Sequence, residues 1–400
     1  MKLYLHHCGV VCALGDNHQE IRRRLLEDAS TGLQMTDAWS AGRVLPVGQV
    51  RGILPDVSHL PVTLRSRNNQ LALAALAQIR EAVDVAIQRF GADRVGIVIG
   101  TSTSGIASTE SAMRAYHEHG SLPSSFQYAV QEMGSPAAML AHELGTGGPA
   151  YTHSSACSSS AKAMASAARL IKMGVCDAVL TGGVDSLCEF TVAGFSALES
   201  VSTEFCNPLS ANRKGINIGE GAAFFLMTAE PAPATAPGAV ALCGWGESSD
   251  GHHMSAPDPA GGGARMAITQ ALQRAGIAPS EVDYINLHGT ATVQNDAMES
   301  HVIQDIFGAA VAVSSTKPFT GHALGAAAAI EAALCWLVMQ DDNPQGLLPP
   351  HLWDGMADPQ LPALHIVAPR QQAGKPLRWI VSNSFAFGGS NACLVLGKTE

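Results

Sequence analysis

One cysteine, Cys157, lies in the segment THSSACSSSAKA at residues 152–163, where almost every neighbour is Ser or Ala. The segment follows a strand-like run and precedes an Ala-rich helical pattern, so we expect Cys157 at a helix N-terminus. The partial positive charge there favours a thiolate by about 1 kcal/mol. Small neighbours also let a long, thin substrate reach the sulfur, although a tight helix contact in the core predicts the same composition. The segment by itself leaves a nucleophile and a buried structural thiol equally open.

Three further polar clusters follow strand-like runs in the second half of the chain. NLHGTATVQND contains His288, SSTKPFTGHALGAAAAIEA contains Lys317 and His322, and NSFAFGGSN contains a Gly pair. α/β proteins tend to build their sites at the carboxyl ends of strands. Each histidine alone is more often a hydrogen-bonded structural residue, and a Gly pair is usually a turn. Together with Cys157, the clusters predict one site.

The elements that must position these residues belong to the α/β class. Short β-branched runs such as RVGIVIG and DAVLTGG alternate with Ala-rich helical patterns. Residues 158–173 and 323–339 are both charge-poor, which predicts two buried helices that are counterparts in two halves. The Pro/Ala-rich segment 229–239 has no periodicity. We place the boundary there and expect an N-terminal half at 1–238 and a C-terminal half at 239–400.

Composition limits the classes of function. The 400 residues are 46% apolar and 14% charged, enough for a large core. A net charge of −10 argues against a nucleic-acid-binding surface, although a local basic patch for an acidic protein partner stays open. Nine cysteines without a CxxC pair, and a start without a signal-peptide pattern, predict reduced thiols in the cytoplasm. No apolar run approaches the length of a membrane span.

Together these motifs resemble the β-ketoacyl-acyl-carrier-protein synthases of the KAS II type, condensing enzymes of the thiolase superfamily. GINIGEGAAFFLM at 215–227 and MSAPDPAGGGARMAITQAL at 254–272 lie between the cysteine segment and the histidine motifs, in the family's order. The resemblance covers nearly the whole chain. It implies a five-layered αβαβα fold of two similar halves, with the two Ala-rich helices in the central layer.

The resemblance implies an acyltransferase that joins an acyl thioester on Cys157 to malonyl-acyl-carrier protein and releases CO2. It implies no metal and no cofactor of the enzyme's own, since the substrates are carried on the phosphopantetheine of acyl carrier protein. Such chemistry needs a nucleophile, donors for a tetrahedral oxyanion and donors for an enolate. By resemblance, the backbone N–H groups of Cys157 and Phe387 form the oxyanion hole. His288 and His322 donate to the malonyl thioester carbonyl.

The resemblance also implies supporting roles around the nucleophile. Lys317 matches an orienting residue that pairs with Glu331, for which a plain buried salt bridge is the alternative. Thr290 and Thr292 match positions that hydrogen-bond the amides of phosphopantetheine, and strand-end capping is their alternative. Phe387 also matches a gating residue, although a Phe there could be core.

Phe195 in AGFSAL is expected to line the acyl pocket or a dimer contact. Ala386 stands where the family usually has Gly, which puts the opening of the Phe387 gate in doubt.

The expected partners are acyl carrier protein and a second subunit, either a copy of this chain or a chain-length-factor-like homologue. The candidate residues for docking the acidic carrier are Arg65, Arg67, Arg213 and Lys214. The basic helix common in the family is thinned here by Asn68 and Asn69, and Ser210 replaces a common Asp. These departures predict a specialised branch, such as the ketosynthase subunit of a bacterial aryl polyene pathway.

Three other functions share part of the pattern. A non-catalytic chain-length-factor-like subunit has the same fold but typically lacks the active cysteine, whereas this chain has Cys157, His288 and His322. A degradative thiolase uses a second cysteine, and Cys393 lies in the strand-like run GGSNACLVLG. A Cys–His hydrolase does not predict the whole-chain order of motifs. An acyl adduct on Cys157 followed by an elongated carrier-bound product distinguishes the condensing enzyme from all three.

Overall fold

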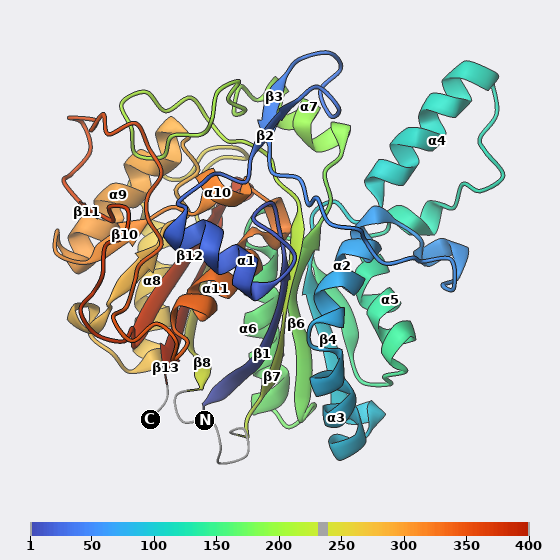
Figure 1. Ribbon diagram of the computed structural model, residues 1–400, viewed down its shortest axis with the longest axis horizontal. Helices are drawn as coiled ribbons and strands as arrows, with labels where there is room; N and C mark the ends of the chain where they lie inside the picture. The colour runs from blue at the N-terminus through green and yellow to red at the C-terminus, as the bar shows by residue number, and fades with distance from the viewer. Residues whose placement is uncertain (1, 231–238, 399–400) are drawn as a thin grey trace.

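The structure is a computed structural model that describes residues 2–230 and 239–398 of the chain (Figure 1). The predicted boundary segment, residues 229–239, lies mostly outside the described residues. The division between residues 238 and 239 therefore stays a prediction. Within the two described ranges, every helix is too short or too polar to cross a bilayer.

Two groups of strands form the main sheet. The first group is β1 (Leu3–Val11), β4 (Val95–Gly100), β5 (Ala150–His153), β6 (Ala178–Asp185) and β7 (Gly221–Thr228). The second group is β8 (Val240–Ser249), β9 (Tyr284–Asn286), β10 (Ala312–Ser314), β12 (Trp379–Ala386) and β13 (Ser390–Lys398). The short β11 (His365–Ile366) extends the second group at its edge, and β2 (Gln34–Thr36) pairs separately with β3 (Leu45–Val47).

The two groups have the same topology. Within the described residues the strand order is β11-β10-β9-β12-β13-β8-β1-β7-β6-β4-β5. In the first group β4 is parallel to β5 and β6, whereas β7 is antiparallel to β6 and β1. In the second group β9 is parallel to β10 and β12, whereas β13 is antiparallel to β12 and β8. Counted along the chain, each group has the order third, second, fourth, fifth, first, so the two halves are structural repeats.

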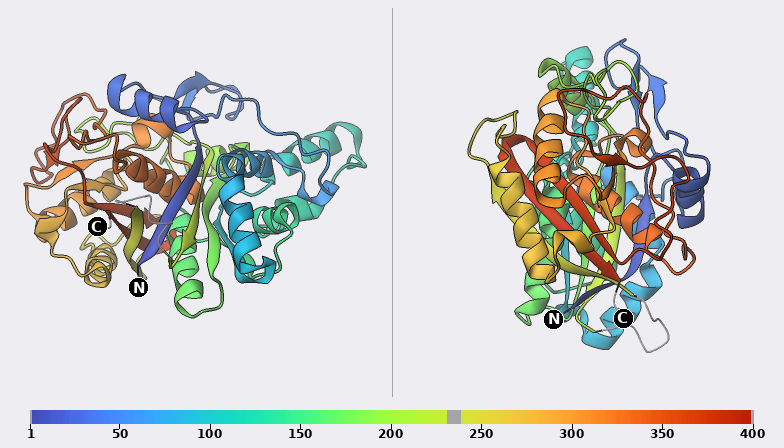
Figure 2. Two further views of the ribbon diagram at one scale, coloured as in Figure 1. Left: turned by 60° about the horizontal axis from the view of Figure 1, so that its bottom comes forward. Right: turned by 90° about the vertical axis from the view of Figure 1, so that its left-hand side faces the viewer.

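Helices separate the two groups except at one edge. In the part of the chain that the structure describes, the groups pair directly only where Leu3 meets Leu242 and Tyr4 meets Ala241, between β1 and β8. The central helices α6 (Ser159–Lys172) and α11 (Ala327–Val338) contact each other and both groups of strands (Figures 1 and 2). The outer helices are α2 (Arg67–Ala77), α3 (Arg80–Phe90) and α5 (Ser135–Leu144) on the first group, and α8 (Gly262–Ala275) and α9 (Val293–Phe307) on the second. The predicted five-layered thiolase-like fold is confirmed.

The Ser- and Ala-rich composition of α6 has a packing reason. A side chain at Gly100 of β4 would place its Cβ 2.3 Å from the backbone nitrogen of Ser160, and one at Gly183 of β6 would lie 2.6 Å from Ser160 Cβ. Helix and strands are therefore in contact through their backbones, which larger residues would prevent. Tight packing in the core therefore accounts for many of the small residues around Cys157. The same packing holds the start of α6 in place.

Four further α-helices complete the described set. They are α1 (His18–Arg22), α4 (Ile106–His119), α7 (Glu189–Ala197) and α10 (Lys317–Thr320). Helix α4 projects from the body, and its Glu110 accepts the backbone N–H groups of Glu189 and Phe190 at the start of α7 (Figure 1).

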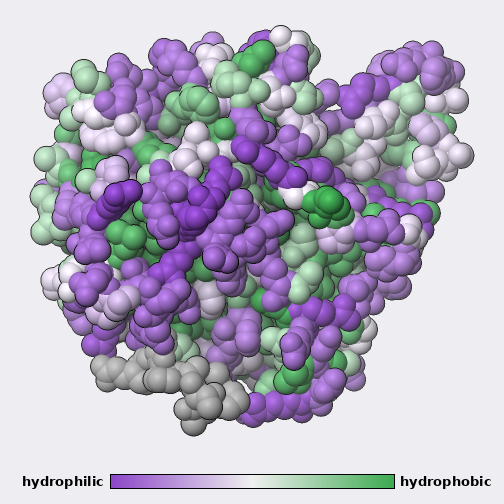
Figure 3. All heavy atoms as spheres, in the orientation of Figure 1, coloured by the Kyte–Doolittle hydropathy of each residue, from purple (hydrophilic) through white to green (hydrophobic). Residues whose placement is uncertain are grey.

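On the face seen in Figure 3, hydrophilic residues cover most of the surface and apolar residues form small, separate patches.

Candidate active site

Hydroxyl groups hold the turn that carries Cys157, between β5 and α6. Ser159 Oγ accepts the N–H of Ser155 at 2.8 Å and donates to the Ala156 carbonyl at 2.6 Å. Ala156 has a φ of 50°, in the left-handed region that residues with a Cβ rarely adopt. This turn places Cys157, which is 3% exposed, with its Sγ 3.0 Å from Nε2 of His322.

Burial decides the ionisation of Cys157. Desolvation raises the pKa of its thiol to about 11, although the Lys317 ammonium and the backbone N–H groups of Phe387 and Cys157 lower it. The helix N-terminus favours the thiolate by about 1 kcal/mol, but desolvation outweighs this contribution, so the resting thiol of Cys157 stays protonated. The backbone N–H groups of Phe387 and Cys157 thus lie near the sulfur, and their role as the oxyanion hole stays a prediction.

His288 and His322 lie side by side above the sulfur, with ring centroids 5.5 Å apart and ring planes at 84°. Burial, and next the charge of Lys317, lower both histidine pKa values well below the ordinary value, so both rings are neutral. Lys317 Nζ lies 3.4 Å from Nδ1 of His288. Because an ammonium group only donates, Nδ1 of His288 accepts and its Nε2 carries the proton. His288 is therefore an N–H donor toward the pocket.

Lys317, the first residue of α10, is held by a buried pair. Its Nζ lies 2.5 Å from Oε1 of Glu331 on α11 and also donates to the carbonyl oxygen of His288. Both side chains are 2% exposed. The pair therefore ties α10, α11 and the backbone of His288 together, as an orienting role requires, and a salt bridge with no other role would have the same geometry.

The donor atoms of Cys157, His288 and His322 lie within 4.8 Å of one another, a spacing that a metal ion could use. The buried ammonium of Lys317 bonds to His288 directly. A fixed positive charge beside the donors opposes a cation in this low-dielectric site. We interpret the cluster as a thiol with two N–H donors.

Sequence reasoning missed Glu299, which supports His288 from α9. Its two carboxylate oxygens accept the backbone N–H groups of His288 and Gly289, each at 2.8 Å, and Oε1 accepts from Asn383 at 3.2 Å. Burial raises the pKa of Glu299 to about 7. The surrounding segment, VQNDAMESHVIQDIF, is rich in polar residues, so no local pattern in the sequence marks Glu299.

Asp185 supports the loop after β4 in the first half and was also missed. Its Oδ1 accepts the N–H groups of Ser102 at 2.7 Å and Thr103 at 2.8 Å. Its Oδ2 accepts the N–H of Ala326, just before α11, at 3.2 Å. Asp185 thus links the two halves of the molecule beneath the site.

Phe387 lies in the turn between β12 and β13. Its ring centroid is 5.4 Å from that of Phe195 on α7, so the two aromatic rings close one side of the pocket. Gly388 and Gly389 have φ values of 79° and 72°, which supply the conformational freedom of the turn. Ala386 has φ −92° and ψ 155°, an ordinary extended conformation, so alanine fits this position without strain.

Two adjoining pockets lead from the surface to Cys157. The inner pocket, of about 40 Å³, is lined by Cys157, Thr290 and both histidines among others. The outer pocket, of about 400 Å³, opens beside Lys214. Both pockets are lined by Ser200, Ser255, Thr292 and Gln294. A linear arm that reaches the sulfur from the surface therefore passes Thr292 and Thr290, whose hydroxyls are 2.9 Å apart. Sequence reasoning missed Gln294, which no hydrophobic pattern marks.

The four candidate docking residues differ in burial and in their ion pairs. Arg67 forms a bidentate pair with the buried Glu220, with contacts of 2.9 and 2.5 Å. Arg213 is buried and bonded to Asp358 at 2.6 Å. These two guanidiniums are neutralised inside the chain, so their prediction as docking charges is corrected to a structural role.

Lys214 is exposed at the mouth of the outer pocket, where its Nζ lies 2.7 Å from Glu204. Arg65 is exposed, and its guanidinium donates to the backbone oxygens of Leu60 and Ser58 at 2.8 and 2.6 Å. Lys214 and Arg65 therefore remain candidates for docking, and Lys214 lies at the entrance itself.

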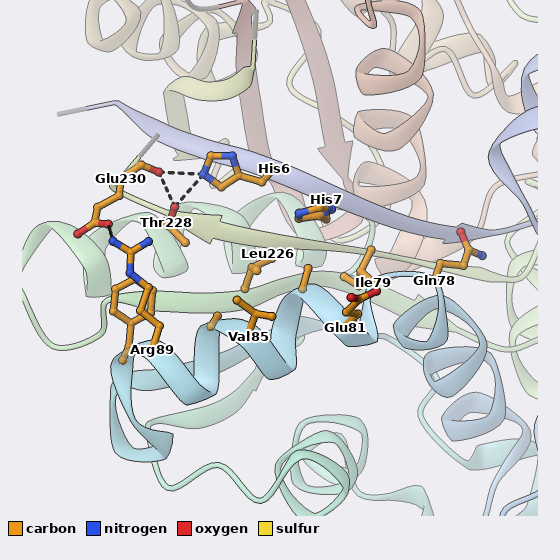
Figure 4. Close-up of a pocket in the computed structure, with 13 residues that line it drawn as sticks. His6, His7, Gln78, Ile79, Glu81, Val85, Arg89, Leu226, Thr228 and Glu230 are labelled. Atoms are coloured by element: carbon orange, nitrogen blue, oxygen red, sulfur yellow. Dashed lines mark hydrogen bonds and ion pairs between the residues drawn. The ribbon is translucent and has the colours of Figure 1, made fainter. Parts of the chain in front are cut away.

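A separate pocket of about 490 Å³ lies between α3, β1 and β7, away from Cys157 (Figure 4). Its polar side chains pair with one another. Nε2 of His6 contacts Thr228 Oγ1 at 3.0 Å and the Glu230 carbonyl at 2.8 Å, and Arg89 pairs with Glu230. None of the four predicted polar clusters lines this pocket. Although it is larger than the inner pocket, we therefore place the active site at Cys157.

Two family models match the chain: the N-terminal domain of beta-ketoacyl synthase over residues 58–232 and the C-terminal domain over residues 240–352. Nodulation protein E of Rhizobium meliloti (strain 1021) is 32% identical over 396 residues, 96% of each chain. The 3-oxoacyl-(acyl-carrier-protein) synthase 2 of Staphylococcus aureus (strain COL) is 32% identical over 359 residues, 86% of this chain and 85% of that protein. Among solved structures, the ketosynthase ApeO in complex with its chain length factor ApeC, from Xenorhabdus doucetiae, has a TM-score of 0.92 and 44% identity, covering 100% of this chain and 98% of that one.

Proposed function

The chain belongs to the β-ketoacyl synthase family, and from this premise we propose that Cys157 is the nucleophile of its condensation reaction. The reaction is a decarboxylative Claisen condensation in fatty-acid or polyketide-like chain elongation. The observation that carries the assignment is the 3.0 Å contact between Cys157 Sγ and His322 Nε2 inside a pocket that His288 completes.

In the first half-reaction the Cys157 sulfur attacks the carbonyl carbon of an acyl thioester on the carrier. The tetrahedral oxyanion accepts the N–H groups of Cys157 and Phe387. The carbon–sulfur bond to phosphopantetheine then breaks, and the thiol proton of Cys157 ends on the departing sulfur. His322 donates its N–H to the thiolate as it develops, which offsets the cost of ionising a buried thiol.

In the second half-reaction the malonyl carboxylate leaves as CO2, and the electron pair of the broken bond forms an enolate. Neutral His288 and His322 donate N–H groups to the enolate oxygen, as their lowered pKa values favour. The enolate carbon attacks the acyl group on Cys157 and forms the new carbon–carbon bond. The released thiolate takes one proton from solvent, and the β-ketoacyl carrier departs.

Intact-protein mass spectrometry with acyl-carrier protein tests this assignment. We expect one acyl adduct on the native protein, none on Cys157→Ala and an unchanged adduct on the control Cys188→Ala, whose cysteine is also buried. Elongated product formed by Cys157→Ala after addition of malonyl-carrier protein contradicts the assignment.

We further propose that acyl carrier protein docks at the outer pocket beside Lys214, and that a second thiolase-like subunit completes the assembly. The solved relative at 44% identity is a ketosynthase in complex with its chain length factor. Exposed apolar side chains on α4 and α7, namely Met113, Tyr116 and Phe190, favour a protein partner on that side. Native mass spectrometry of the chain alone, and with a chain-length-factor-like homologue, distinguishes a homodimer from a heterodimer.

The same proposal places the chain in a specialised bacterial pathway such as aryl polyene synthesis, in the cytoplasm. Only Lys214 and Arg65 of the four docking candidates remain exposed, which fits the thinned docking helix. The nine cysteines are all free thiols, as a reducing compartment favours. Product analysis with carrier-bound aromatic and short aliphatic starters tests the pathway.

A further inference from the structure

Lys162, on α6, begins a run of hydrogen bonds that the condensation mechanism does not use. Its Nζ donates to Ser390 Oγ at 2.5 Å, across 228 residues of sequence. Ser390 Oγ lies 2.9 Å from Ser158 Oγ, and Ser158 Oγ donates to the Ser155 carbonyl at 2.8 Å. The run therefore connects the second half of the molecule with the turn that carries Cys157.

The direction of each bond in this run is determined. An ammonium group only donates, so Ser390 accepts from Lys162. Because the hydroxyl of Ser158 donates its single proton to the Ser155 carbonyl, Ser390 must donate to Ser158. Each hydroxyl thus donates once, Ser158 also lies 3.3 Å from Ser155 Oγ as a second possible donor to it, and the charge of Lys162 strengthens the first bond.

The two ends of the run adjoin the two N–H donors of the oxyanion hole. Ser158 directly follows Cys157, and Ser390 directly follows the turn Phe387–Gly389. That turn contains two glycines with left-handed φ, and its backbone is otherwise anchored to Asp250 and Met254, outside the nucleophile turn. The run of hydroxyls adds a direct link between this turn and the turn that carries Cys157.

We propose that Lys162 is a positioning residue that sets the spacing between the Phe387 and Cys157 N–H groups through Ser390 and Ser158. The proposal rests on the proposed function of Cys157. It distinguishes the steps of the reaction, because acyl transfer uses the oxyanion hole whereas malonyl decarboxylation uses the histidines. Loss of the Lys162 donor should therefore slow acyl transfer and spare decarboxylation.

Lys162→Met, which keeps the length of the side chain and removes the donor, tests the proposal. We expect the rate of Cys157 acylation to fall on the order of 10- to 100-fold, the effect of a displaced catalytic group. Malonyl-carrier decarboxylation, measured as CO2 release without an acyl substrate, should stay near the native rate. Ser390→Ala should reproduce the loss, the double variant should be no slower than either single variant, and Lys162→Arg should restore acylation.

Lys172→Met is the matched control, because Lys172 is exposed at the far end of the same helix. It should acylate at the native rate. Native acylation by Lys162→Met overturns the proposal, and so does an equal loss of both activities, which indicates a structural role. Failure of the proposed function is a different result, since Cys157→Ala would then still condense.

Discussion

At the scale of single residues, the site consists of a neutral thiol beside two neutral imidazoles, and each protonation state has a structural cause. Burial raises the pKa of Cys157 to about 11. Burial and Lys317 lower the pKa values of His288 and His322. The same desolvation thus makes the nucleophile harder to ionise and keeps the histidine N–H donors uncharged. Catalysis depends on donors that act only when negative charge develops.

The two histidines should separate in their effects. His288→Ala should lower malonyl-carrier decarboxylation by about 10²-fold, as loss of an oxyanion donor does, and leave acylation close to native. His322→Ala should lower both rates, because Nε2 of His322 contacts the Cys157 sulfur directly at 3.0 Å. CO2 release and adduct formation measure the two rates. Native decarboxylation by His322→Ala would restrict His322 to the role of thiol partner.

The raised thiol pKa predicts the pH dependence of alkylation. At pH values below the pKa, each increase of one pH unit raises the reactive thiolate fraction about tenfold. Alkylation of Cys157 by iodoacetamide should therefore accelerate steadily from about pH 7 to pH 9, without a plateau. Mass spectrometry of the modified protein measures the rate, with Cys157→Ala as the control for other cysteines. A plateau near pH 7 would mean a resting thiolate paired with a charged histidine.

At the scale of elements, backbone contacts and buried ion pairs hold the strand ends that carry the site. Gly100 and Gly183 let α6 rest on β4 and β6. Arg67 at the start of α2 pairs with Glu220 just before β7, and Glu220 also accepts the N–H groups of Val50 and Leu187, each at 3.1 Å. One carboxylate therefore joins four segments.

Removal of Arg67 should destabilise the fold. Arg67→Met leaves the fully buried Glu220 carboxylate without its counter-charge, which costs roughly 3 kcal/mol. Urea unfolding measures the loss. Arg65→Met is the control, since Arg65 is exposed and bonds to neutral backbone oxygens, so its loss leaves no buried charge unpaired and should cost roughly 1 kcal/mol or less. Native stability of Arg67→Met, with a raised KM for the carrier, would return Arg67 to a docking role.

At the scale of the whole molecule, the site exists only where the two repeats meet. The first half supplies Cys157, and the second supplies His288, Lys317, His322 and Phe387. The contacts between α6 and α11 hold the two halves together, and the contacts of His322 with Cys157 and His288 show that the segments after β5, β9 and β10 meet. The outer pocket opens beside Lys214, where we propose that the acidic carrier protein docks.

Docking should depend on Lys214 and on salt. Because rim charges act mainly on encounter, Lys214→Glu should raise the KM for carrier-bound substrate several-fold, weaken its salt dependence and leave kcat nearly unchanged. Steady-state kinetics at several salt concentrations measure the effect. Lys172→Glu, the same change far from the entrance, should leave KM unchanged. Equal effects of the two substitutions would place carrier docking on another surface.

Local sequence determined the α/β class, the two buried central helices and the family, because hydrophobic periodicity, residue size and motif order can all be read from nearby positions along the chain. The small residues around Cys157 and the polar clusters after strands marked the site in the same way. Glu299 was overlooked because its role depends on the backbone N–H groups of His288 and Gly289, which only the folded chain brings to its carboxylate.

Only the tertiary structure decided which charges are free and that the Cys157 thiol is neutral at rest. Arg67 and Glu220 are separated by 153 residues, and Lys162 and Ser390 by 228. Sequence spacing along one helix or strand contains no information about such partners. The protonation state of Cys157 depends on the same long-range packing, because desolvation is set by all the elements that enclose the sulfur. The sequence therefore determined which groups are present, and the packing of the two repeats determined their charge.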